Sequence, residues 1–104
     1  MLTSRLTLFL RSAWLGALLA MAACQTTPPV QEMSDARQAI SAAQDAGAAD
    51  KAASQFEAAV GFLKKAETAL NNREYARARH DALQAKNKAI EALQRSEVEK
   101  DSGP

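Results

Sequence analysis

Few residues in this 104-residue chain have side chains suited to chemistry, and the most distinctive is Cys24, its only cysteine. Cys24 follows an unbroken run of small and apolar residues, Ala13 to Ala23, which Arg5 and Arg11 precede. A basic segment, then an apolar run, then small residues is the layout of an export signal. The run is shorter than the roughly 20 apolar residues that a membrane-spanning helix needs. We therefore expect residues 1–23 to be a signal peptide.

The end of this segment, Met21-Ala22-Ala23-Cys24, resembles the lipobox of bacterial lipoprotein precursors, although Leu is more usual where Met21 stands. The resemblance implies that the Cys24 sulfur is diacylated, that the chain is cut before it, and that the new amino group receives a third acyl chain. Two or three acyl chains hold a protein to a bilayer almost permanently. An acylated sulfur also needs no disulfide partner, which suits a lone cysteine in an oxidising compartment. Gln25 after it implies, by the same resemblance, the inner leaflet of a Gram-negative outer membrane, facing the periplasm.

No other combination of residues predicts catalysis. His80 is the only histidine, and Arg77 and Arg79 beside it would oppose a bound cation. The chain has no Ser/His/Asp arrangement, no Gly-rich phosphate loop and no Cys/His cluster. We expect no enzyme activity, no metal site, no small-molecule substrate and no cofactor apart from the covalent lipid on Cys24.

Positive charge is concentrated in residues 61–95, which carry eight basic and four acidic side chains. This basic block is a candidate contact for an anionic envelope component, such as peptidoglycan carboxylates or lipid A phosphates. An ordinary solvated helix surface is the simpler explanation, because acidic residues are interspersed with these basic ones. Nucleic acid is not an expected partner, because the chain has neither a groove-reading motif nor interleaved aromatic residues. The candidate contacts are Lys64, Lys65, Arg73, Arg77, Arg79, Lys86 and Lys88.

Small and apolar residues recur at steps of three and four, which is the spacing of one helical face. The first such stripe runs from Met33 to Gly47. The second begins after Asp50, a candidate N-cap, and ends before Asn71 and Asn72, which favour a break. The third begins at Tyr75, expected to be a buried hinge between two helices. The stripes consist of Met33, Ala36, Ile40, Ala43 and Gly47; Ala52, Phe56, Ala59, Leu63, Ala66 and Leu70; Tyr75, Ala78, Ala82, Ala85, Ala89 and Ala92.

The pattern predicts an all-α fold, because no strand-like alternation appears. We expect a short antiparallel three-helix bundle, or a helical hairpin with an Ala-rich seam, preceded by a signal-peptide helix. The domains expected are the signal peptide at 1–23, the acylated cysteine and an extended, Pro-containing spacer at 24–29, the helical domain at 30–95, and a disordered polar tail at 96–104. The helices should be roughly 17, 21 and 25 residues long.

Alanine limits the predicted core, since 24 of the 104 residues are Ala and only 13 residues after Ala23 are large and apolar. Alanine has the highest helix propensity and lets helix axes approach closely. We therefore predict helices that form readily and a tertiary fold that is marginal or completed by self-association.

Two resemblances support the helical prediction. Residues 62–85 follow part of the tetratricopeptide pattern once, with Lys65 where that pattern has Leu, which implies a helical hairpin rather than a solenoid. The stretch 35–93 looks like an Ala-rich helical domain of unknown function found in proteobacterial lipoproteins, although that family commonly has Ala-Pro where Ala52-Ala53 stands here. The residues that carry this second likeness are Ala36, Ile40, Ala43, Gly47, Ala48, Leu63, Ala66, Leu70, Tyr75, Ala78, Ala82, Ala85 and Ala89.

Together these observations predict a small envelope lipoprotein whose helical domain is a non-catalytic interaction or scaffold module facing the periplasm. Its expected partners are the membrane, through the acyl chains, and either another envelope protein or a second copy of itself. The alternative is a binder of an anionic envelope component, peptidoglycan or lipid A, through the basic block.

Overall fold

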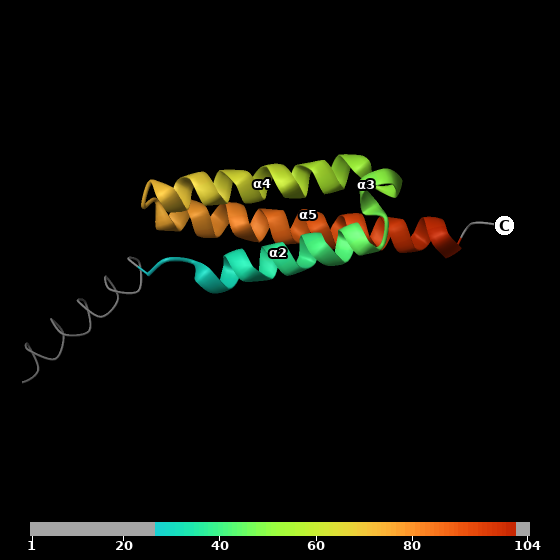
Figure 1. Cartoon of the computed structure of the whole chain (residues 1–104), viewed down its shortest axis with the longest axis horizontal. Helices are drawn as coiled ribbons and strands as arrows, with labels where there is room; N and C mark the ends of the chain where they lie inside the picture. The colour runs from blue at the N-terminus through green and yellow to red at the C-terminus, as the bar shows by residue number, and fades with distance from the viewer. Residues whose placement is uncertain (1–26, 102–104) are drawn as a thin grey trace, which may run out of the picture.

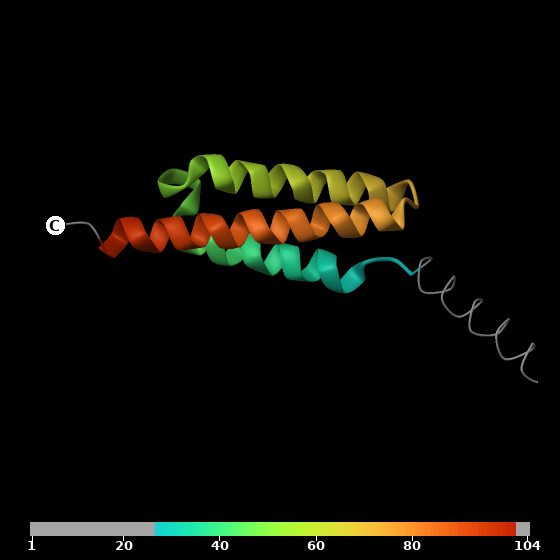
Figure 2. The same ribbon diagram turned by 180° about the vertical axis from the view of Figure 1, so that it is seen from behind.

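The computed structural model describes residues 27–101, so the predicted signal-peptide helix and the lipobox lie outside the described residues. Within them the chain forms four helices and no strand: α2 (Val30–Asp45), α3 (Ala48–Lys51), α4 (Ala53–Asn71) and α5 (Tyr75–Asp101). The predicted all-α fold is confirmed. Of the three long helices, α4 runs antiparallel to both α2 and α5, as the views from the two sides of the molecule show (Figures 1 and 2).

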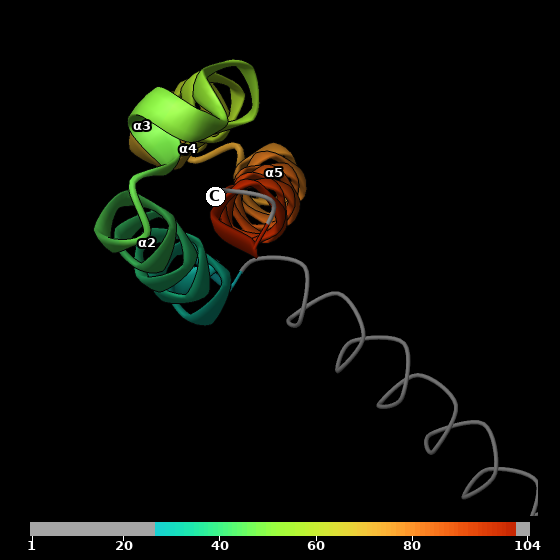
Figure 3. The same ribbon diagram turned by 90° about the vertical axis from the view of Figure 1, so that its right-hand side faces the viewer.

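Helix α5 is the central element, because it packs along both α4 and α2, whereas α2 and α4 touch each other much less. Seen along the helix axes, the three long helices stand at the corners of a triangle (Figure 3). The short helix α3 joins α2 to α4 at one end, and the α4–α5 turn closes the other end (Figure 1). With 27 residues, α5 is about 40 Å long at 1.5 Å per residue.

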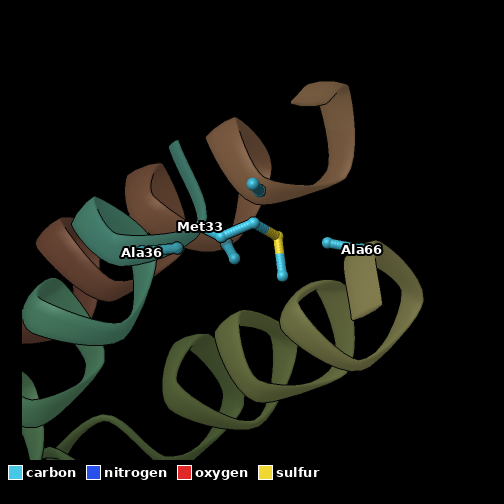
Figure 4. Close-up of a cluster of buried hydrophobic side chains, with 5 residues drawn as sticks. Met33, Ala36 and Ala66 are labelled. Carbon is cyan, nitrogen blue, oxygen red and sulfur yellow. The ribbon is translucent and has the colours of Figure 1, made fainter. Parts of the chain in front are cut away.

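The core is made of alanine. Apart from Met33 and Pro29, every buried apolar side chain in residues 27–101 is Ala. Met33 is 2% exposed and extends from α2 towards Ala66 of α4 (Figure 4). The stripe predicted for the third helix is confirmed, since its alanines are all 0% exposed: Ala78, Ala82, Ala85, Ala89 and Ala92.

Larger apolar side chains lie around this core and remain partly accessible. Phe62, Leu63 and Leu70 pack against the cluster that contains Met33, and Phe56 and Leu93 pack against a second cluster at the α3 end. Close approach of alanine-lined helices therefore forms the centre of the bundle, as the sequence predicts.

The connection between α2 and α4 differs from the prediction. Asp50 is not an N-cap but an exposed residue inside α3. The chain reverses at Gly47, whose φ of +81° is readily adopted only by glycine. The Gly47 carbonyl accepts hydrogen bonds from the Asp50 and Lys51 amides, at 3.2 and 3.0 Å. An extra helical turn forms there because it buries Ala48, and then Ala52, in one cluster with Ala92 of α5.

The α4–α5 connection falls at Asn71 and Asn72, where the sequence predicts a break. The left-handed residue, however, is Arg73, with a φ of +59°. The Arg73 amide donates to the Leu70 carbonyl at 3.0 Å, and the Glu74 amide donates to the Ala69 carbonyl at 2.8 Å. These two bonds form a Schellman motif, in which glycine usually occupies the position of Arg73.

The predicted disordered tail from Ser96 is wrong over most of its length, because α5 continues to Asp101. Ser96 is 1% exposed, and its hydroxyl donates to the Ala92 carbonyl at 2.8 Å. Ser96 lies one turn beyond Ala92 and extends the small-residue stripe. The helix therefore continues, although the polar composition of residues 96–104 predicts disorder. Residues 102–104 lie outside the described range.

Candidate functional site

The described chain begins at Thr27, three residues after the predicted acylation site Cys24. Residues 27–29 are not helical, as predicted for a spacer, but they are held on the bundle. Pro29 is fully buried, and Arg79 of α5 donates from Nη2 to the Thr27 carbonyl at 3.1 Å. The described chain therefore joins the bundle at the beginning of α5.

The same arginine also fixes the start of α2. Arg79 Nε donates to Glu32 Oε1 at 3.2 Å, and these side chains are 32% and 29% exposed. The sequence predicts Arg79 as a contact for an anionic partner. In the structure, its guanidinium is instead occupied by Glu32 and Thr27 within the bundle. Its observed partners identify it as a positioning residue for the N-terminal segment.

Three other predicted contacts are brought together. Lys64 and Lys65 of α4 and Arg77 of α5 line one open cleft of about 500 Å³ beside the α4–α5 turn. Arg77 is paired with Glu74 at 3.2 Å. The Lys65 ammonium lies 5.2 Å from the centre of the Phe62 ring, a cation–π contact. The other lining residues are Thr68, Ala69, Asn72, Glu74 and Asp81.

Arg73 stands in the turn between two lining residues, Asn72 and Glu74, and is exposed. Among the described residues, Lys64, Lys65 and Arg73 form no ion pair. We call these three residues the turn cations. Sequence spacing alone does not single them out, because they belong to one helix and to a turn whose conformation the sequence does not define.

The remaining predicted contacts, Lys86 and Lys88, lie at least two turns further along α5 than Arg77. Lys88 is paired with Glu91 at 3.3 Å, and Arg95 donates to the same carboxylate at 3.3 Å. The basic block is therefore not one surface.

His80 and Tyr75 both lie on α5. His80 is exposed, and Tyr75 is only partly buried rather than the buried hinge that the sequence predicts. No group of three potential metal ligands occurs in residues 27–101. None of the four helices is both long enough and apolar enough to cross a membrane.

The outer face of α5 carries exposed apolar side chains. Leu83 is 43% exposed, Ile90 37% and Val98 68%. They lie opposite the buried alanine stripe, so they contribute nothing to the centre of the bundle.

In a comparison with known families, residues 31–102 match the family described as a domain of unknown function (DUF4398). The match begins one residue after α2 starts and covers all four helices. No curated protein and no solved structure matches the chain.

Proposed function

This chain belongs to the DUF4398 family, a domain of unknown function, and on that premise we propose that it is a lipid-anchored, non-catalytic interaction module of the bacterial cell envelope. In this proposal residues 1–23 are an export signal and Cys24 carries the acyl chains. The helices face the periplasm from the inner leaflet of the outer membrane of a proteobacterium.

The observation that carries the proposal is the attachment of Thr27 to Arg79. A lipid at Cys24 would be separated from this attachment by three residues, or about 11 Å of extended chain. The α4–α5 turn would then be near the membrane, and α5 could extend up to about 40 Å from that end. A folded rod anchored at one end suits a module that presents a surface to partners.

The outer face of α5 is our candidate for that surface. Leu83 and Ile90 are seven residues apart and lie on one stripe, and Val98 continues it. Apolar side chains of this size gain free energy when a partner covers them. The partner is either another envelope protein or a second copy of the chain.

Site-specific photocrosslinking in intact envelopes tests this function. A photoreactive residue at Leu83 or Ile90 should give a reproducible adduct, whereas one at Glu57, exposed on α4, should give none. An adduct at twice the chain mass would identify self-association, and an adduct of a different mass would identify a second protein. Absence of adducts from both α5 positions, with the protein present in the envelope, would contradict the interaction module.

A second candidate function is supported by the cleft beside the α4–α5 turn, namely binding of an anionic envelope component. Salt distinguishes the two candidates. Binding of a polyanion should weaken steeply between low and physiological ionic strength, whereas an apolar contact on α5 should not.

A further inference from the structure

We propose that the α4–α5 turn binds the phosphates of anionic lipid headgroups in the membrane that holds the chain, through the turn cations Lys64, Lys65 and Arg73. This inference rests on the proposed anchor at Cys24 and narrows the anionic candidate to one end of the bundle and one source of phosphate.

The first step is position. Arg79, the fifth residue of α5, holds Thr27, so the anchored side of the chain and the α4–α5 turn lie at the same end of the bundle. Figures 1 and 2 show the turn and the start of α2 together at one end, and α3 with the end of α5 at the other. An anchor three residues before Thr27, or about 11 Å of extended chain, would allow the turn to reach the membrane surface.

The second step is availability of charge. Arg37, Arg77, Arg79, Lys88 and Arg95 each lie within 3.5 Å of a carboxylate, and their charges are compensated. The turn cations have no such partner among the described residues. Lys64 and Lys65 line an open cleft, to which Thr68 and Asn72 add polar groups and Glu74 and Asp81 add carboxylates. Arg73 stands in the adjacent turn. Ammonium and guanidinium donors around an accessible hollow are the groups that bind phosphate oxygens.

The third step is the charge of the opposite end. The far end, around α3 and the last two turns of α5, has five acidic side chains against three basic ones. These are Asp45, Asp50, Glu97, Glu99 and Asp101 against Lys51, Arg95 and Lys100. Beside the turn, four basic side chains, Lys64, Lys65, Arg73 and Arg77, outnumber the carboxylates Glu74 and Asp81. An anionic surface would therefore attract the turn and repel the far end, which would orient the rod away from the membrane.

This polarity favours a headgroup over a glycan polymer. The acyl anchor fixes the turn at the lipid surface, where the local concentration of headgroup phosphates is high and even weak contacts are occupied. A polymer that reached the bundle from the periplasm would meet the acidic end first.

The test uses a chain of residues 24–104 with Cys24→Ser, which retains every contact described above and carries no acyl chain. Binding of this chain to phosphatidylcholine vesicles is compared with its binding to vesicles that also contain phosphatidylglycerol. Both are measured at low and at physiological salt. We expect binding to rise by about tenfold or more with the anionic lipid at low salt and to fall at physiological salt. The variant Lys64→Gln/Lys65→Gln/Arg73→Gln should lose this gain.

The matched control is Lys51→Gln/Lys100→Gln, which removes positive charge from the far end and should bind like the parent chain. Equal loss in both variants, or no gain with phosphatidylglycerol, would overturn the proposal. Displacement from the vesicles by millimolar inorganic phosphate would also overturn it, because it would indicate a site for free anions. So would a triple variant that loses binding to purified sacculi but keeps its binding to vesicles. Because no acyl chain is present, these results are independent of whether Cys24 is acylated in the cell.

Discussion

Arg79 and Glu32 are 47 residues apart in sequence, yet their side chains meet at 3.2 Å between α5 and the first turn of α2. The same guanidinium holds the Thr27 carbonyl at 3.1 Å, so one side chain joins the N-terminal segment, α2 and α5. Pro29, buried beside this junction, removes the freedom that a Pro-containing spacer would otherwise have. Arg79 and Pro29 together therefore fix where the chain joins the bundle at Thr27.

Loss of the Arg79–Glu32 pair should loosen the start of α2 with a small effect on the rest. Because both side chains are about one-third exposed, a double-mutant cycle of Arg79→Gln and Glu32→Gln should give a coupling of about 0.5–1 kcal/mol, smaller at high salt. Hydrogen exchange should accelerate at the amides of the first turn of α2, including Met33, which donates to the Pro29 carbonyl. Unchanged exchange there would refute the positioning role of Arg79.

The alanine seam should not tolerate a larger side chain. Ala82 is 0% exposed in a cluster with Met33 and Ala66, so Ala82→Leu must separate the helices, at a cost of about 1–3 kcal/mol or more. Ala76→Leu is the matched control, because Ala76 is exposed on the same helix. Urea melts of the two variants should differ by that amount, and equal midpoints would mean that α5 does not pack through this stripe.

Gly61 offers a gain in stability. A Cβ at this position in α4 would meet nothing within 4 Å, so Gly61→Ala should stabilise the bundle by about 0.5–1 kcal/mol through helix propensity. Gly47→Ala should do the opposite, because Gly47 has a φ of +81°. Thermal unfolding of both variants checks the contrast, and a destabilised Gly61→Ala would show that α4 is not helical there.

Arg73 should show a conflict between stability and lipid binding. Its left-handed backbone costs a residue other than glycine about 1–2 kcal/mol, so Arg73→Gly should raise stability by about 1 kcal/mol while it weakens binding to phosphatidylglycerol vesicles. Arg73→Gln keeps the unfavourable backbone and removes only the charge, so it should lose binding without gaining stability. If Arg73→Gly binds as the parent chain does, Arg73 makes no contact with lipid.

The helices and their buried faces could be predicted from sequence because an alanine at every third or fourth position has one structural meaning. Ala78, Ala82 and Ala85 are buried as that spacing requires. The ends of helices were harder to predict. The connection after α2 begins at Gly47 rather than at Asp50. Burial of Ala48 and Ala52 adds a helical turn there that helix-capping preferences do not predict.

The candidate site shows the same division. The charge distribution along the sequence identifies the basic block. The roles of its residues differ, because contacts between helices decide which of them are paired. Arg79 is occupied by Glu32 and Thr27, whereas Lys64 and Lys65 have no carboxylate partner among residues 27–101. Such pairings depend on how α2 and α4 are rotated against α5, and single-sequence periodicity does not define that rotation.

The central claim is the lipid anchor, and the intact mass of the protein extracted from membranes tests it most directly, beside a Cys24→Ala variant. We predict a mass that corresponds to residues 24–104 with acyl chains on Cys24, and a Cys24→Ala chain that lacks them. A chain that retains residues 1–23 and carries no lipid would contradict the account.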